Sequence, residues 1–194
     1  GMDTPASKDT ARNRRDALDY LDKDAASLFR SAAGTLQYLA EDVPTVKFSC
    51  SQVMEGMTTP TVTHQLRLHR VARYLLAHPG EIWEYKYQKK PNALTEMVDS
   101  DWAADTDTRK SVSCVAEAFG THLLDVVVAK QQMLALSSGE AEFYAIIKGS
   151  AIGIQTQQLL EAMLRDTMKL KILSDSSAAR GIAQRQGSGR VRHL

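Results

Sequence analysis

The order of strand-like and helix-like segments after residue 93 limits the fold of this chain more than any other feature. The segments form the series strand, strand, strand, helix, strand, helix, and they cover residues 94–98, 111–119, 122–129, 137–165, 169–174 and 178–186. Gly120-Thr121, between the second and third strands, is typical of a β-hairpin turn. This order predicts an antiparallel meander followed by a β–α–β crossover, and therefore a mixed sheet with the long helix on one face.

The residues before this series have a mostly helical pattern. Apolar residues recur at helical spacing between 25 and 40, and two further helices are expected on either side of Pro60, the second ending at His78-Pro79-Gly80. Residues 81–88 alternate in a way that favours an additional strand. The expected division is a polar lead-in that opens with Gly1-Met2, typical of a tag-cleavage scar, then a helical region and an α/β domain, at 1–26, 27–93 and 94–194.

Charge and cysteine content narrow the class of protein. The net charge is only +1 over 194 residues, so the overall charge of the protein does not favour binding to nucleic acid. An argument for such binding depends on local clusters of basic residues. The apolar runs fall far short of the roughly 20 residues that a membrane-spanning helix needs. No secretory signal is recognisable, and Cys50 and Cys114 are too few for a disulfide framework. We therefore expect an intracellular protein, with no membrane partner and no secretion.

Acidic residues gather where two of the expected strands end. Four aspartates fall within nine residues, at Asp99, Asp101, Asp105 and Asp107, and such a cluster is either a metal site or a solvated turn. Asp175 directly follows the strand at 169–174, at a carboxyl end where crossover folds usually place their sites. If this strand lies parallel to the strand at 94–98 and beside it, Asp99 and Asp175 converge.

A third carboxylate comes from the long helix. Glu140 and Glu142 point in roughly opposite directions because successive helical residues are about 100° apart. Glu142 heads a stripe of small residues that would let the helix approach the sheet closely, namely Ala145, Gly149 and Gly153. We therefore expect Glu142 to join Asp99 and Asp175, and three converging carboxylates suit Mg²⁺, a hard cation that prefers oxygen ligands.

Each of these residues also has a structural interpretation when it is considered alone. Asp175 could be a helix N-cap, Glu142 a first-turn partner of the helix dipole, and Asp99 a turn former. Only their joint placement favours a metal site. Asp101 ranks second to Asp99, because we expect it to point to the opposite face of the strand or into the loop.

Three motifs in this chain resemble a known family. VDSDWAADTDTRKSVS, ALSSGEAEFYA and ILSDSSAA are similar, in order and spacing, to the ribonuclease H domain of copia-type (Pseudoviridae) retrotransposon polyproteins. LFRSAAGTLQYLA and HQLRLHRVARYLLAHPG resemble the thumb and connection region that precedes it. The resemblance covers residues 27–194, and it implies a ribonuclease H-like fold at 94–194 preceded by a thumb-like region at 27–93.

The resemblance also implies an activity. The family hydrolyses the RNA strand of RNA–DNA hybrids with two Mg²⁺ ions, for which Mn²⁺ can substitute, held by four carboxylates. Asp99, Glu142 and Asp175 match three of them and are the expected catalytic and metal-binding residues. The fourth lies in the family's last strand and helix, beyond the RHL at which this sequence stops. The expected domain therefore lacks its last strand and helix, and its activity depends on the missing carboxylate.

The alternative hypothesis is a catalytically inactive retroelement remnant that acts as a nucleic-acid-binding or interaction module. Polymerase activity is not expected, because the sequence lacks the paired aspartates of a polymerase palm. The expected partners are an RNA–DNA hybrid and the remainder of a reverse transcriptase polyprotein, in a cytoplasmic particle or the nucleus. Candidate phosphate-binding residues are Arg67, Arg70, Arg109, Lys110 and Arg180.

Overall fold

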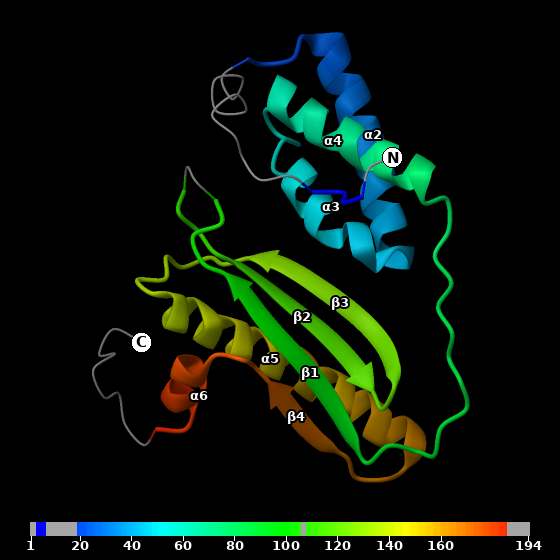
Figure 1. Ribbon diagram of the computed structural model, residues 1–194, viewed down its shortest axis with the longest axis vertical. Coiled ribbons are helices and arrows are strands. Elements are labelled where there is room, and N and C mark those ends of the chain that lie inside the picture. The colour runs from blue at the N-terminus through cyan, green and yellow to red at the C-terminus, as the bar shows by residue number, and fades with distance from the viewer. Residues whose placement is uncertain (1–2, 7–18, 106–107, 186–194) are drawn as a thin grey trace. The chain divides into compact units, whose positions relative to one another are not determined.

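The computed structural model describes residues 3–6, 19–105 and 108–185, so Gly1-Met2 and the RHL at 192–194 lie outside the described residues (Figure 1). The chain forms two compact units, Gly1–Glu84 and Tyr85–Leu194. Helices build the first unit and a mixed sheet with helices builds the second, so the predicted mixed α/β class is confirmed. The domain bounds at 26 and 93 stay a prediction. None of the described helices is long and apolar enough to cross a lipid bilayer.

The first unit is a small helical bundle. Its described elements are α2 (Lys23–Asp42), the 3₁₀ helix η1 (Pro44–Val46), α3 (Lys47–Met54) and α4 (Val62–Ala77). Apolar residues at helical spacing meet in one core, where Phe29 and Leu36 of α2 pack with Val53 and Val71. Asp22 caps α2 by accepting hydrogen bonds from the N–H groups of residues 24 and 25. The three expected helices of this region are therefore present.

In the described part of the second unit, four strands form one sheet in the order β3-β2-β1-β4. They are β1 (Ala93–Asp101), β2 (Val112–Phe119), β3 (His122–Lys130) and β4 (Lys169–Leu173). The first three pair antiparallel as a meander, and β4 lies parallel to β1. The crossover helix is α5 (Ser138–Leu164), and α6 (Ser177–Ala183) follows β4. The predicted order of elements and the parallel pair are both confirmed, in a sheet compatible with a ribonuclease H-like fold.

Helix α5 lies close against one face of the sheet (Figure 1). Its small residues make this possible: a Cβ added to Gly149 would lie 2.5 Å from Cγ1 of Val98, and one added to Gly153 would lie 2.6 Å from Cδ1 of Leu170. Ala145 is buried against Val98 and Val115. The expected stripe of small residues therefore faces the sheet.

Strand residues alternate between the α5 side and the opposite side of the sheet, which we call the outer face. Val98 of β1 and Leu170 of β4 contact α5, so the residues directly before and after each of them on its strand belong to the outer face. On β1 and β4 the outer face includes Met97 and Leu173, which are paired in register and exposed.

Residues 78–92 form neither helix nor strand, so the strand expected at 81–88 is wrong. Ile82 and Tyr87 belong to opposite sides of the alternation, yet their exposed fractions are 97% and 96%. The segment is attached to the β2–β3 hairpin through side chains: the Tyr85 hydroxyl donates to the Leu123 carbonyl at 3.0 Å. Gln88 also donates to the carbonyl of Phe119 at 2.8 Å. The prediction was wrong because the side chains alternate as in a strand, but the segment has no neighbouring strand among the described residues with which to pair.

Candidate metal centre

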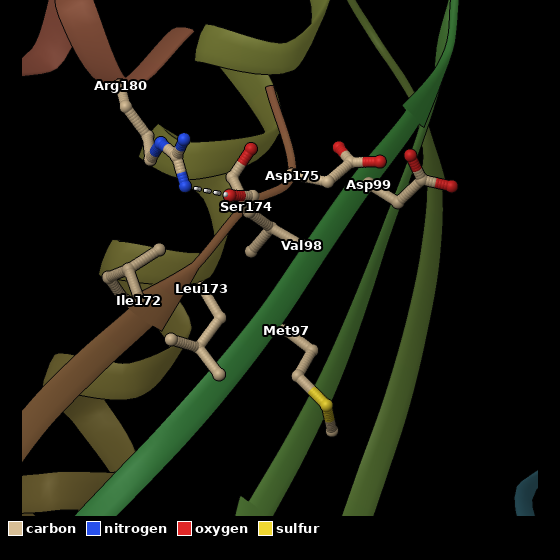
Figure 2. Close-up of a pocket in the computed structure, with 8 residues that line it drawn as sticks. All are labelled: Met97, Val98, Asp99, Ile172, Leu173, Ser174, Asp175 and Arg180. Carbon is tan, nitrogen blue, oxygen red and sulfur yellow. Dashed lines mark hydrogen bonds between the residues drawn. The ribbon is translucent and has the colours of Figure 1, made fainter. Parts of the chain in front are cut away.

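Among the described residues, Asp99, Glu142 and Asp175 form a group whose carboxylate oxygens all lie within 4.8 Å of one another. Asp99 is near the end of β1, Asp175 follows β4 by two residues, and Glu142 lies in the first turns of α5. Because β1 and β4 are neighbouring parallel strands, their carboxyl ends meet at one edge of the sheet. Figure 2 shows Asp99 and Asp175 side by side at that edge. The predicted convergence is therefore observed, whereas a catalytic role for the three residues stays a prediction.

The start of α5 determines which glutamate reaches this group. The Ser137 hydroxyl oxygen caps the helix by accepting from the N–H of Glu140 at 3.2 Å. The Glu140 side chain is buried and turns back, accepting from the Leu136 N–H at 2.8 Å and from the Tyr144 hydroxyl at 3.0 Å. Glu140 therefore fixes the helix terminus. Glu142, two residues later, is directed to the sheet, as its place above the small-residue stripe predicts.

Hydrogen bonds compensate only one of the two carboxylate oxygens of Glu142 for its burial. Its Oε1 accepts a hydrogen bond from the backbone N–H of Ser100 at 3.3 Å. Its Oε2 is buried and has no hydrogen-bond partner in the part of the chain that the structure describes. Burial raises the pKa of the Glu142 carboxyl, and the negative charges of Asp99 and, more weakly, Asp175 raise it further, while the Ser100 N–H opposes them.

This environment fits a cation. Positive charge would stabilise a buried carboxylate oxygen that has no donor and lies close to two further carboxylates, and a donor set made only of carboxylate oxygens suits hard divalent ions. The cluster can therefore bind a metal, and the identity of the ion belongs to the proposal below.

A pocket of about 490 Å³ opens beside two of the three carboxylates (Figure 2). It is lined by Met97, Val98, Asp99, Ile172, Leu173, Ser174, Asp175 and Arg180. Nη1 of Arg180 donates to the Ser174 carbonyl at 3.2 Å, which holds the guanidinium at the pocket wall. The described residues provide no ion-pair partner for Arg180. Carboxylates and an arginine therefore share one pocket without neutralising each other.

Sequence comparison finds relatives of this chain among retrotransposon polyproteins. Over 125 residues, 63% of the chain, the sequence is 33% identical to the retrovirus-related Pol polyprotein from transposon RE2 of Arabidopsis thaliana and 31% identical to that from transposon RE1. This chain fits a segment of a copia-type Pol polyprotein. The matched segment covers 8% of the length of either polyprotein.

A further relative is shorter than these polyproteins. It is an uncharacterized mitochondrial protein of Arabidopsis thaliana, 32% identical over 120 residues, which are 61% of this chain and 49% of that protein. No protein-family model matches the chain, and no solved structure matches it significantly.

The structure decides between the alternatives that the sequence left open for Asp175 and Asp99. Asp175 is not the N-cap of α6, because Ser176 holds that position and its hydroxyl oxygen accepts from the Ala179 N–H at 3.2 Å. Asp99 is not a turn former, since β1 continues through Asp101. For the same reason, the prediction that Asp101 points to the opposite strand face is wrong: residues two apart in a strand share a face. Asp101 nevertheless lies outside the group of three.

The loop after β1 uses its other described aspartate for its own structure. Asp105 accepts from the backbone N–H of Thr108 at 2.9 Å and from its hydroxyl at 2.7 Å, and it forms an ion pair with Lys130. Asp107 lies outside the described residues. Trp102 donates its indole N–H to the Ala135 carbonyl at 3.1 Å, which anchors the loop beside the start of α5.

The five candidate phosphate-binding residues are divided between the two units. Arg67 and Arg70 belong to α4 in the first unit, where Arg67 pairs with Glu55 at 3.5 Å and Arg70 donates to the Thr4 hydroxyl at 3.1 Å. The other three belong to the second unit, and they are Arg109, Lys110 and Arg180. Of these, Arg180 lines the pocket. Sequence reasoning missed Leu173 and Ser174 as pocket residues, although their place directly before Asp175 could have indicated them.

Proposed function

We propose that this chain, once the fourth carboxylate is supplied, hydrolyses the RNA strand of RNA–DNA hybrids with two Mg²⁺ ions, as part of a retrotransposon reverse transcriptase polyprotein inside the cell. The observation that carries the proposal is the approach of Asp99, Glu142 and Asp175 to within 4.8 Å, with a buried oxygen of Glu142 lacking a donor. Similarity to two Pol polyproteins supports the polyprotein context. The three motifs in which these carboxylates lie support the choice of reaction.

The three carboxylates would hold the ions from two directions. Asp99 and Asp175 extend from the ends of neighbouring strands, and Glu142 approaches from the helix that covers the sheet. When bound, two divalent ions activate water for attack on a phosphodiester and stabilise the leaving oxygen. The Ser100 N–H orients Glu142, and Arg180 can donate to a phosphate oxygen in the adjoining pocket.

Cleavage of a labelled RNA–DNA hybrid, with Mg²⁺ or Mn²⁺ present, tests the proposal when this chain is compared with a version extended past Leu194 to supply the fourth carboxylate. We expect the cleavage rate to fall by about 100-fold or more in each of Asp99→Asn, Glu142→Gln and Asp175→Asn. This loss exceeds the one usually seen when a residue that only hydrogen-bonds to a metal ligand is replaced. Asp101→Asn, on the same face of β1, is the matched control and is expected to keep most of the activity.

Two outcomes would contradict the proposal in different ways. Cleavage that survives Asp99→Asn would overturn the ligand assignment. An extended protein that binds both the ions and the hybrid but cleaves nothing would instead identify a non-catalytic hybrid-binding module.

A further inference from the structure

Two lysines stand in line with the pocket on the outer face of β4. Lys169, Lys171 and Leu173 are alternate residues of this strand and are all exposed, whereas Leu170 and Ile172 between them are directed to α5. Side chains two residues apart on one strand face are separated by about 6.6 Å. The line continues through Leu173 into the pocket beside Asp99 and Asp175.

No acidic residue faces these lysines from the neighbouring strand. Lys169 pairs in register with Ala93 and Lys171 with Thr95, and neither partner carries a charge. Along the outer face of β1 the next residues are Met97 and then Asp99, so the first carboxylate on this side belongs to the metal centre. Within the described ranges, neither lysine forms an ion pair. Their charge is therefore available to an external anion.

Arg180 adds positive charge at the pocket wall, beside Ser174. Arg180 comes from α6, after Asp175 in the chain, while Lys169 and Lys171 come from β4, before it. The pocket is thus bordered by lysines along one direction and by an arginine in another. An anionic strand that runs along β4 to the carboxylates passes the two lysines and then the pocket wall with Arg180, and this distribution of charge matches such a strand.

We propose that Lys169 and Lys171 bind successive phosphates of one nucleic-acid strand along β4, and that Arg180 binds a phosphate of the same strand at the pocket wall. The identity of the ligand as an RNA–DNA hybrid rests on the proposed function. The contacts are to phosphate, so they position the strand without reading its bases. Exposed Met97 and Leu173 lie between the two charged regions and provide apolar contact for a sugar.

The proposal is tested by binding in the absence of metal. Fluorescence anisotropy in EDTA, with a labelled RNA–DNA hybrid and the whole chain, gives the Kd over a series of salt concentrations. The double variant Lys169→Gln/Lys171→Gln is expected to raise Kd by about 10-fold or more and to lower the salt slope by about 2, one for each phosphate contact removed. Arg180→Gln should lower the slope by about 1.

The matched control removes the same charge from elsewhere. Lys23 on α2 and Lys148 on α5 are both exposed and neither belongs to the sheet, so Lys23→Gln/Lys148→Gln is expected to leave Kd and the salt slope close to wild type. Circular dichroism and gel filtration establish that each variant is folded and monomeric, because lysines on an edge strand also prevent strands of different molecules from pairing.

Equal Kd values for the two double variants, measured on folded monomers, would overturn the proposal. So would a wild-type chain that fails to bind the hybrid. The β4 variant could instead aggregate while its monomeric fraction binds the hybrid normally. That result would mean that the lysines prevent strands of different molecules from pairing and do not bind phosphate. Binding that depends on the lysines without any cleavage by the extended protein in Mg²⁺ contradicts only the proposed hydrolysis, whereas cleavage with lysine-independent binding contradicts only this inference.

Discussion

Glu96 of β1 and Glu117 of β2 are directly paired across the sheet, and both side chains are buried. In the described part of the chain, neither oxygen of Glu96 has a hydrogen-bond partner, and Oε2 of Glu117 has none. Burial, followed by the adjacent Glu117, raises the pKa of Glu96 to about 8. Like charges directly opposite each other destabilise a sheet, so the Glu96 carboxyl keeps its proton at neutral pH.

This pair makes stability depend on pH. Between about pH 5 and about pH 8 the folded state holds a proton on Glu96 that the unfolded chain has lost, so the free energy of unfolding falls as the pH rises through this range. Above it, both states are ionised at this residue and the dependence levels off. Urea unfolding at a series of pH values measures the effect.

Glu96→Gln is expected to flatten this dependence and to stabilise the fold at about pH 8 by on the order of 1–3 kcal/mol, because an amide stays neutral and can donate to Glu117. Asp42→Asn, which changes an exposed carboxylate at the end of α2, is the control and should keep the wild-type slope. An unchanged slope in Glu96→Gln would show that Glu96 does not hold the proton.

Removing a carboxylate from the metal centre should change the thermal stability in opposite directions in the absence and in the presence of the ion. Glu142→Gln is expected to raise the unfolding temperature of the metal-free protein, because it removes a buried charge near Asp99 and Asp175. The same variant should lose the stabilisation that millimolar Mn²⁺ gives the wild type by binding the folded state. Scanning calorimetry measures both, and equal Mn²⁺ stabilisation of the two proteins would contradict the assignment of Glu142.

Two glycine substitutions separate close packing from helix propensity. Gly149→Ala is expected to lower the free energy of unfolding by about 1–3 kcal/mol, since its Cβ would lie 2.5 Å from Cγ1 of Val98. Gly34→Ala on α2 has nothing within 4 Å of the added atom and is expected to stabilise by about 0.5–1 kcal/mol. Chemical unfolding of both variants tests the contrast, and a stabilising Gly149→Ala would refute the close approach of α5.

Helix capping offers a test of how Glu142 is positioned. Ser137→Ala removes the N-cap of α5 and is expected to cost about 1 kcal/mol of stability and to weaken Mn²⁺ binding, because Glu142 lies five residues after the cap. Thr61→Ala removes the N-cap of α4 and should cost a similar amount without changing the affinity for Mn²⁺. Titration calorimetry with Mn²⁺ distinguishes the two, and equal Mn²⁺ affinities would mean that the cap does not position Glu142.

The sequence allowed the convergence of Asp99 and Asp175 to be predicted because it follows from periodicity and strand direction alone. A β–α–β crossover makes two strands parallel, and parallel strands bring their carboxyl ends together. Glu142 was predictable for a similar reason, since the small residues below it identify the helix face that meets the sheet. These properties are local in the sequence and need no knowledge of side-chain packing.

Other features depend on which residues and strands become neighbours in the folded chain, and the local sequence pattern does not specify this. The pairing of Glu96 with Glu117 is set by the alignment of two strands joined by a ten-residue connection. The strand expected at 81–88 had the alternation of a strand but no neighbour to pair with. Asp175 and Ser176 are both good capping residues, and only the structure shows that Ser176 is used.

The contact of α5 with the sheet has a consequence for how the protein can change. Gly149 and Gly153 lie two and three turns from Glu142 along one continuous helix, and they set its height above the strands. A shift of α5 by one residue would move Glu142 by about 1.5 Å along the axis, enough to break a metal coordination sphere. If the three carboxylates hold an ion as proposed, affinity for that ion measures how well the core is assembled, and substitutions remote from every carboxylate lower it while the domain stays folded.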